Sequence, residues 1–427
     1  MHLALVNARI VTGTGAEAIE DGTILVEGDR IAWVGPAAEF EPADRGLSET
    51  VDCAGRTILP GLVDAHAHLV YAGVSDPYTI ELSKSIEQAT VDSALNAALL
   101  LTLGFTSIRD VGTRGNISVV IRDAIQAGRL AGPRIQASKQ IISVWGGLGD
   151  FHPTHIFRRQ QSATALTEIV TGPWEARNAV RQHVKDGADW VKVEASGTGF
   201  NPLCPAERDT ISFEELRAVV EEAAEKQRPV ACHAESRRSI IKAATAGVRT
   251  VEHAVYLDDE GTEAVLEHGV AICPTLALYT AYAEKGLEFG IPAEIVTNHR
   301  RTHERHVEAI RKAYEAGVTI VAGSDSGLTN FPQGGGLHEI CSYVELVGMT
   351  PHEALLTATR DAARVIGFAD AGTIEAGKLA DLLVLRENPL DRIRAIVEAD
   401  SREAVLKGGA VVSGELPSPT PVATPAR

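Results

Sequence analysis

The 427-residue chain contains few cysteines, and those it has stand far apart. They are Cys53, Cys204, Cys232, Cys273 and Cys341, and no two of them form a Cys-x-x-Cys pair. An odd number of scattered cysteines forms neither a disulfide framework nor a zinc knuckle. We therefore expect most of them to be small buried side chains in a reducing compartment.

Positive charge is also in deficit, because 40 lysines and arginines stand against 57 aspartates and glutamates, for a net charge of −17. Nucleic acids and anionic membranes are bound by basic surfaces, so this balance argues against both kinds of partner. No run approaches the roughly 18 apolar residues that a membrane-spanning helix needs. Residues Met1–Asn7 lack a basic region followed by a long apolar stretch, so we expect no signal peptide and a cytoplasmic location.

Both ends of the chain have the pattern of short strands separated by turns. The expected strands are Ala4–Val11, Gly22–Glu27, Arg30–Val34 and Thr50–Cys53 at the start, and Ala380–Leu385, Ala404–Leu406 and Gly409–Val412 near the end. We predict that residues 1–56 and 371–414 together form a small β-sandwich domain. Residues 415–427 contain four prolines and are predicted to be a disordered tail.

Between these ends, apolar strand-like runs alternate with helical stretches, which is typical of repeated βα units. Eight strands are expected, at Leu59–His66, Thr106–Val111, Arg134–Ser138, Trp190–Glu194, Pro229–His233, Thr250–His253, Ala271–Thr275 and Thr319–Gly323. The helices between them include Ser93–Leu103, Pro173–Asp186, Phe213–Lys226, Arg237–Ala246, Asp259–His268 and Arg301–Ala316. The fold class is therefore α/β, with residues 57–370 forming a (β/α)8 TIM barrel. The long loop 145–171 would lie over the mouth of this barrel as a lid.

The most informative segment is the first barrel strand, which ends Asp64-Ala65-His66-Ala67-His68. Side chains at positions i and i+2 of a strand point the same way, so His66 and His68 project together from one strand end. Two adjacent imidazoles suit one metal ion. The simpler alternative is a pair of polar residues at the start of a loop.

Four other strands bring polar side chains to the same end of the barrel, where barrel enzymes carry their catalytic groups. These side chains are Lys192, His233, His253 and Asp325. Each alone has an ordinary explanation, since a strand-end histidine is often a hydrogen-bonded loop residue and a strand lysine often extends to water. Four histidines, one aspartate and one buried lysine in a single barrel together predict a metal site.

Six motifs carry a family resemblance: Gly61–His68, Val251–Ala254, Pro274–Leu276, Gly323–Ser326, Ala358–Ala363 and Gly372–Leu382. With them the chain resembles the amidohydrolase superfamily over nearly its whole length. The motifs are most similar to the imidazolonepropionase-like branch, which includes metal-dependent dipeptidases and prolidases with a dinuclear metal centre. They specify the superfamily more strongly than the branch, and they do not specify the substrate.

The resemblance implies that His66, His68 and Asp325 hold one divalent ion and that His233 and His253 hold a second. The ligand types do not settle the metal, because imidazole together with carboxylate suits zinc, cobalt or manganese. Zinc is the expected ion, with cobalt or manganese as alternatives. The two ions would lower the pKa of a shared water to near neutrality and so supply a metal-bridging hydroxide. Asp325 would take a proton from it and return the proton to the leaving amine.

The resemblance also implies that Lys192 is carboxylated by CO2 and bridges the two ions. A carbamate offers two oxygens, whereas a neutral amine cannot bridge two cations. Glu194 lies on the same face of the strand and is the competing bridge, since some members of the superfamily use a glutamate there.

Relatives often carry Gly-Gly-His-Gly-Asp after the third strand, where this chain has Gly146-Gly147-Leu148-Gly149-Asp150. A histidine that could contact substrate is thus replaced by Leu148. Either His152 or His155 could take its place, or the pocket is simply less polar. This departure weakens any transfer of dipeptidase specificity.

Further candidates for substrate binding lie near other strand ends. Arg237 or Arg238 could pair with a substrate carboxylate, although a surface arginine at the start of a helix is an equally good explanation. Tyr71 and Tyr279 could line the mouth of the site or serve ordinary packing. The helical segment with His299, His303 and His306 is expected to present these histidines on a solvated face.

The sequence thus predicts a metal-dependent amidohydrolase that cleaves an amide or peptide-like C–N bond of a small molecule, and we expect a homo-oligomer. One alternative is hydrolysis of a urea, carbamate or thiocarbamate in a xenobiotic, for which Leu148 argues. Another is a mononuclear cyclic-amide hydrolase or deaminase, although the glutamate that deaminases carry three residues after the fifth strand's histidine is Ser236 here, and Glu235 is one residue early. A binding protein that kept the fold is the non-enzymatic alternative, and the intact ligand set argues against it.

Overall fold

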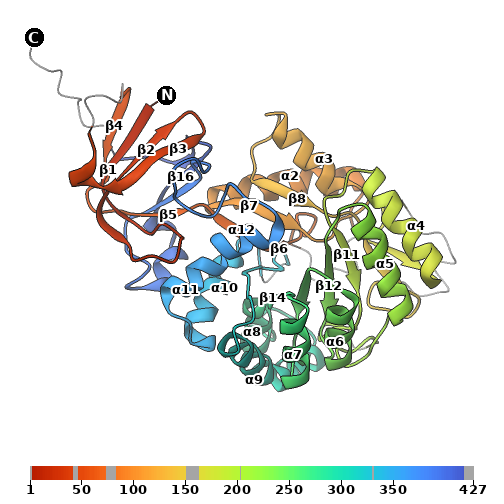
Figure 1. The fold of residues 1–427 in the computed structure, drawn as a ribbon. Helices are drawn as coiled ribbons and strands as arrows, with labels where there is room; N and C mark the ends of the chain where they lie inside the picture. The colour runs from red at the N-terminus through yellow and green to blue at the C-terminus, as the bar shows by residue number, and fades with distance from the viewer. Residues whose placement is uncertain are drawn as a thin grey trace, which may run out of the picture. The chain divides into compact units, whose positions relative to one another are not determined.

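The computed structural model of the chain describes residues 2–41, 47–73, 83–150, 163–201, 203–328 and 331–417. The chain divides into two compact units (Figure 1). The first unit contains Met1–Val63, Leu99–Ser107 and Met349–Arg427, and the second contains Asp64–Ala98 and Ile108–Gly348. The predicted domain boundaries at residues 56/57, 370/371 and 414/415 stay predictions. No helix in the described ranges combines the length and the apolar character needed to cross a bilayer.

Strands from both ends of the chain form one mixed sheet in the first unit. The N-terminal strands are β1 (His2–Ile10), β2 (Ile19–Glu27), β3 (Arg30–Pro36), β4 (Glu49–Asp52) and β5 (Thr57–Pro60), and the C-terminal strands are β15 (Leu382–Leu385), β16 (Arg402–Lys407) and β17 (Ala410–Gly414). The order is β17-β16-β15-β5-β1-β2-β3, with β4 paired to β1. The predicted sandwich is not confirmed, because these strands hydrogen bond as a single sheet.

The antiparallel pair of β5 and β15 joins the two chain ends, with Leu59 opposite Leu383. One face of the sheet covers a core that includes Leu5, Ile58 and Leu382, all fully buried. Burial of such side chains is the main favourable term that holds the two ends together. The first unit also contains α11 (Pro351–Thr357) and α12 (Arg360–Ile366).

The strands that lie wholly or partly in the second unit fall into two further sheets. One has the order β6-β7-β8, with β6 at Leu62–Ala67, β7 at Phe105–Asp110 and β8 at Arg134–Ala137. The other has the order β10-β9-β11-β12-β13-β14, with β9 at Ile141–Val144, β10 at Thr167–Val170, β11 at Val191–Glu194, β12 at Val230–Ala234, β13 at Thr250–His253 and β14 at Ala271–Cys273. All pairs in this second sheet are parallel, as the βα pattern predicts.

The eighth expected strand, Thr319–Gly323, forms a single parallel bridge between Ile320 and Ile272 of β14. It also hydrogen bonds to β6 through Ala322, whose carbonyl accepts from the Ala65 N–H at 2.9 Å. The segment therefore lies between β14 and β6. A single closed barrel sheet is not detected among the described residues, so the α/β class with parallel strands is confirmed while the closed barrel stays a prediction.

The loop predicted at residues 145–171 is partly wrong, because its end forms β10. Residues Thr167–Val170 pair in parallel with β9, which is itself a short run of four buried residues that the sequence analysis did not assign to a strand. Such short apolar runs are hard to assign from periodicity alone. Residues 151–162 lie outside the described ranges, so the predicted lid stays a prediction.

Helices alternate with these strands along the second unit. They are α2 (Ile86–Thr102), α3 (Ile117–Gln126), α4 (Gly172–Lys185), α5 (Phe213–Glu225), α6 (Arg237–Ala246), α7 (Asp259–Glu267), α8 (Leu276–Lys285), α9 (Ala293–Glu315) and α10 (Gly336–Ser342). Side chains cap the starts of α5, α6 and α7. Ser212 and Glu215 form a capping box at α5, and Ser236 caps α6.

The solvated face predicted on α9 is wrong for two of its three histidines. His299 and His306 are 1% and 0% exposed. They share one side of the helix with the buried Thr302, and α9 packs against α8 on that side. The sequence pattern led to the wrong expectation because histidine was counted as a polar residue. A neutral imidazole ring can pack in an apolar interface.

We predict that Leu382→Ala, which empties a fully buried position in the core of the first unit, costs about 2–5 kcal/mol of unfolding free energy. Val411→Ala on β17 is the control, because Val411 is 44% exposed and its loss should cost at most about 0.5 kcal/mol. Denaturant unfolding followed by circular dichroism measures both. Equal effects of the two substitutions would contradict the assigned core.

Candidate metal centre

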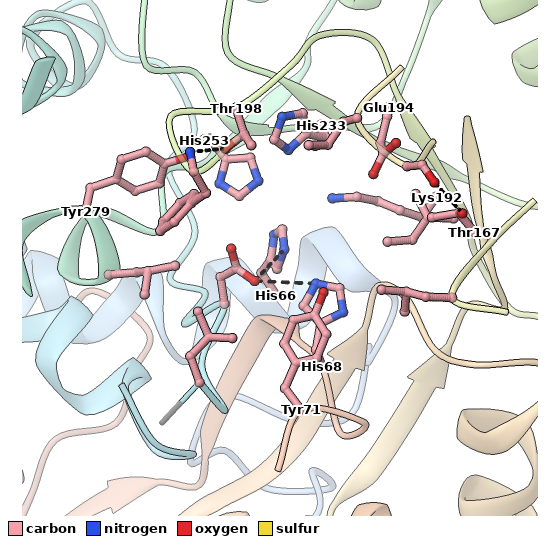
Figure 2. A pocket seen from close by; sticks show the side chains of 18 residues that line it. His66, His68, Tyr71, Thr167, Lys192, Glu194, Thr198, His233, His253 and Tyr279 are labelled. Carbon is pink, nitrogen blue, oxygen red and sulfur yellow. Dashed lines mark hydrogen bonds and ion pairs between the residues drawn. The ribbon is translucent and has the colours of Figure 1, made fainter. Parts of the chain in front are cut away.

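A cavity of about 80 Å³ lies in the second unit at the carboxyl ends of its parallel strands. The register of the sheet explains why side chains from distant parts of the sequence meet there. Glu194 of β11 lies opposite His233 of β12, and Ala234 lies opposite His253 of β13. Figure 2 shows the rings of His66, His68, His233 and His253 around one central space, with the Lys192 amine pointing into it.

All four histidines are buried, with exposures of 1–6%. Burial lowers the pKa of each ring, and it lowers the pKa of His68 and His233 to about 3. The rings are therefore neutral, and each carries one protonated nitrogen and one free lone pair. A neutral imidazole is the form that binds metal ions.

Each ring has one nitrogen turned away from the cavity and bonded to the protein. His68 Nδ1 lies 2.8 Å from the Gly112 carbonyl, and His233 Nε2 lies 2.9 Å from the Gly197 carbonyl. Both are N–H donors, because a carbonyl can only accept. The opposite nitrogen of each ring therefore carries the lone pair.

The other two rings are fixed in the same way by side chains. His66 Nδ1 lies 2.7 Å from a Glu252 carboxylate oxygen. His253 Nδ1 lies 2.7 Å from Thr275 Oγ1, which already donates its own hydrogen to the Pro274 carbonyl and so accepts from His253. Partners of this kind orient metal-ligating histidines. The lone pairs left over fit a metal centre in this cavity.

Asp325 joins the histidines from the segment that follows Gly323. Its carboxylate oxygen lies 3.7 Å from His66 Nε2 and 3.4 Å from His68 Nε2, and the three side chains form a cluster that could hold an ion. Gly323 permits this approach, since a Cβ there would lie 2.4 Å from the Cys273 sulfur and 2.6 Å from His66 Cβ. Burial raises the pKa of Asp325 to about 7.

The backbone is strained where these ligands emerge. Positive φ angles, which residues other than glycine rarely adopt, occur at His253 (73°), Thr275 (53°) and Asp325 (48°). Strain of this kind persists only where the surrounding structure enforces it, and it clusters at functional sites.

Lys192 lies on β11 and is 3% exposed, and its amine has no hydrogen-bond partner among the described residues. Burial lowers its pKa from the ordinary value, which favours the neutral amine. A buried amine without a hydrogen-bond partner fits a lysine that is modified or that contacts a bound group. A neutral amine is the form that CO2 carboxylates. Glu194, two residues on, also lines the cavity, and burial raises its pKa to about 7.

Two of the four predicted substrate contacts line the cavity. Tyr71 stacks on His68 with ring centroids 4.5 Å apart. Tyr279 donates its hydroxyl to Glu235 Oε1 at 2.7 Å. Arg237, the first residue of α6, is not among the lining residues. It forms ion pairs with Asp258 and Glu260 at the start of α7. His152 lies outside the described residues.

Sequence reasoning missed the buried residues that hold the ligands from behind. Arg109, Glu252, Thr275 and Glu235 are all fully buried, and none was assigned a role in the site. A signal was present for Glu252 and Arg109, because a charged residue inside an apolar strand needs a partner. Thr275 lies within the motif Pro274–Leu276, but nothing in that motif indicated its contact with His253.

Comparisons with known proteins find relatives that match nearly the whole chain. Ochratoxinase from Aspergillus niger is 29% identical over 422 residues, which cover 95% of this chain and 85% of the relative. Imidazolonepropionase from Rhizobium rhizogenes is 26% identical over 419 residues, which cover 94% and 96%. The crystal structure of a prolidase complexed with N-methylphosphonate-L-proline has a TM-score of 0.87 at 30% identity and covers 97% of this chain and 100% of that one.

The sequence model of the amidohydrolase family matches residues 57–412, which is most of the chain. The relatives fall in the imidazolonepropionase-like branch that the sequence motifs resemble. The chain therefore belongs to the amidohydrolase family, and it is a hydrolase that acts on carbon–nitrogen bonds.

Proposed function

We propose that this enzyme is a metal-dependent amidohydrolase that cleaves an amide or peptide-like C–N bond of a small molecule. One observation carries the proposal. Four neutral, buried imidazoles each have one nitrogen bonded to the protein and the other free, and all four line a single cavity. The ochratoxinase, imidazolonepropionase and prolidase relatives support a bond of this class.

We assign His66, His68 and Asp325 to one divalent ion, and His233 and His253 to a second. The cluster of the first three side chains supports this division. Lys192, as its carbamate, is proposed to hold both ions, because its amine lies unpartnered between the two groups. Zinc is the proposed metal, with cobalt and manganese as alternatives.

Two bound divalent ions would supply an activated water near neutral pH and polarise the scissile carbonyl. The residues of the chain would do the rest. Asp325 has the most exposed of the ligand side chains, at 17%, so its carboxylate can reach the substrate. It is proposed to hold the proton of the attacking water and to deliver it to the leaving nitrogen. Tyr71, stacked on His68, would form a wall of the site.

A second candidate is hydrolysis of a urea, carbamate or thiocarbamate in a xenobiotic. The apolar lining of the cavity favours it, since Leu148 joins Ile141 and Leu166 there, together with Phe200, Leu278 and Leu328. The bond-breaking chemistry is the same in both candidates, and the substrate alone differs.

A mononuclear deaminase is less well supported. Ser236 stands where the deaminase glutamate is required, and its side chain caps α6. Glu235 accepts the Tyr279 hydroxyl. A homo-oligomeric state and a cytoplasmic location stay predictions.

We predict that Lys192→Ala lowers kcat by at least about 10³-fold and that metal analysis of this variant gives fewer ions per chain than the wild type. The reason is that the bridging carbamate is lost. Lys139→Ala is the control, because Lys139 is also buried but pairs with Asp186 at 2.5 Å. One ion per chain in the wild type, together with full activity in Lys192→Ala, would rule out the dinuclear centre.

We predict that a hydrolysis panel of N-acyl amino acids, dipeptides, anilides, ureas and carbamates gives the highest kcat/KM for compounds with apolar groups beside the scissile bond. Leu148→His should lower that value for the best apolar compound about tenfold, a loss typical of a disturbed apolar pocket. Leu203→His at an 83% exposed position is the control. Ammonia release from purines, pyrimidines or triazines, without hydrolysis of the panel, would instead support a deaminase.

A further inference from the structure

Behind His66 lies a buried ion pair that the proposed reaction does not use. Glu252 and Arg109 are both fully buried, and Arg109 Nη2 lies 2.9 and 3.1 Å from the two carboxylate oxygens of Glu252. The same carboxylate accepts from His66 Nδ1 at 2.7 Å. Burying two charges carries a large desolvation cost, which their attraction offsets only when the geometry is good. Such a pair therefore calls for an explanation.

Arg109 is held on every side. Its Nε donates to the Ala65 carbonyl at 2.6 Å, and its Nη1 donates to Thr250 Oγ1 at 2.8 Å. The guanidinium also lies 4.4 Å from the centre of the Trp190 ring, in a cation–π contact. Because every nitrogen of this fork has a partner, Arg109 fixes the position of Glu252 and keeps it ionised.

Among the four cavity histidines, His66 is the one whose hydrogen-bond partner is a carboxylate. Glu235 lies 3.5 Å from His233 Nε2, but the hydrogen bond of that nitrogen goes to the Gly197 carbonyl at 2.9 Å. The partners of His68 and His233 are the carbonyls of Gly112 and Gly197, and the partner of His253 is the Thr275 hydroxyl. A carboxylate behind an imidazole raises the basicity of the opposite nitrogen and makes it a stronger metal ligand.

We infer that Glu252, held by Arg109, is a positioning residue that fixes His66 with its proton on Nδ1 and strengthens metal binding at the position formed by His66, His68 and Asp325. The inference rests on the proposed function for the metal itself. It goes beyond that proposal by assigning a role to two residues that touch neither substrate nor ion.

The cluster of His66, Glu252 and Cys273 could instead be taken for a second metal site, because its ligand atoms lie within 4.8 Å of one another. Both oxygens of Glu252 already accept from the Arg109 cation, which would repel a divalent ion there. The cluster therefore supports His66 rather than binding metal.

The test is the zinc affinity of the metal-free protein, measured by titration against a chelator. Glu252→Gln keeps the size of the side chain and an acceptor oxygen but removes the charge. Glu339→Gln is the matched control, since Glu339 is equally buried and accepts from the backbone N–H groups of Leu276 and Ala277. We expect Glu252→Gln to weaken one of the two zinc sites about 10–100-fold and the control to leave both unchanged. Unchanged affinities in Glu252→Gln would overturn the inference.

A second readout needs no metal. In metal-free protein with ¹⁵N-labelled histidine, NMR should show His66 protonated at Nδ1, and Glu252→Leu should abolish the hydrogen-bonded Nδ1 proton while Glu339→Gln keeps it. If an unpaired Arg109 impairs folding, two double variants remove both charges and take the place of the single ones: Arg109→Met, Glu252→Gln in the zinc titration and Arg109→Met, Glu252→Leu in the NMR measurement. A wild type that binds no zinc contradicts the proposed function, and the ring signal then still tests the positioning role. A His66 ring unaffected by Glu252→Leu overturns it.

Discussion

The structure of the cavity depends on one constraint, which is that four imidazoles packed together in a buried space must all stay neutral. Charged rings at such distances would repel one another, and His66 and His253 lie only 5.1 Å apart between ring centroids. Each neutral ring then has one N–H to satisfy. The protein supplies an acceptor behind every ring, and as a consequence every remaining lone pair faces the cavity. The acceptors that satisfy the buried N–H groups of the four rings therefore also orient the opposite nitrogens to bind a metal ion.

The parallel sheet provides the frame in which this problem is solved. Adjacent strands end at the same level, so residues far apart in sequence reach the cavity with little freedom. The remaining adjustment is made by the backbone, through positive φ angles at His253, Thr275 and Asp325. The closeness of β6 to the segment of Asp325 also requires a residue without a side chain at Gly323. The strands thus set the positions of the residues that line the cavity, and the positive φ angles set the directions in which a few of their side chains point.

Features of the fold and the site could be predicted from the sequence where they depend on local patterns, and not where they depend on tertiary contacts. The His66/His68 pair and the strand-end positions of His233 and His253 were predictable, because alternation and parallel topology are local and regular. The contacts of Arg237 were not, because Asp258 and Glu260 compete for it from the next βα unit. The burial of α9's histidines and the pairing of β9 with β10 depend on tertiary packing. Glu252 was quoted within a motif, yet its role appears only when Arg109 is seen beside it.

The most direct test of the central claim is a crystal structure of the zinc-loaded protein with anomalous scattering at the zinc edge. The account predicts two peaks in the cavity, one about 2.0–2.1 Å from Nε2 of His66 and His68, the other at the same distance from Nδ1 of His233 and Nε2 of His253. Continuous density from Lys192 Nζ to both peaks would complete the picture. No peak in the cavity, or a peak bound instead on the far side of His66 between its Nδ1 and Glu252, would contradict the account.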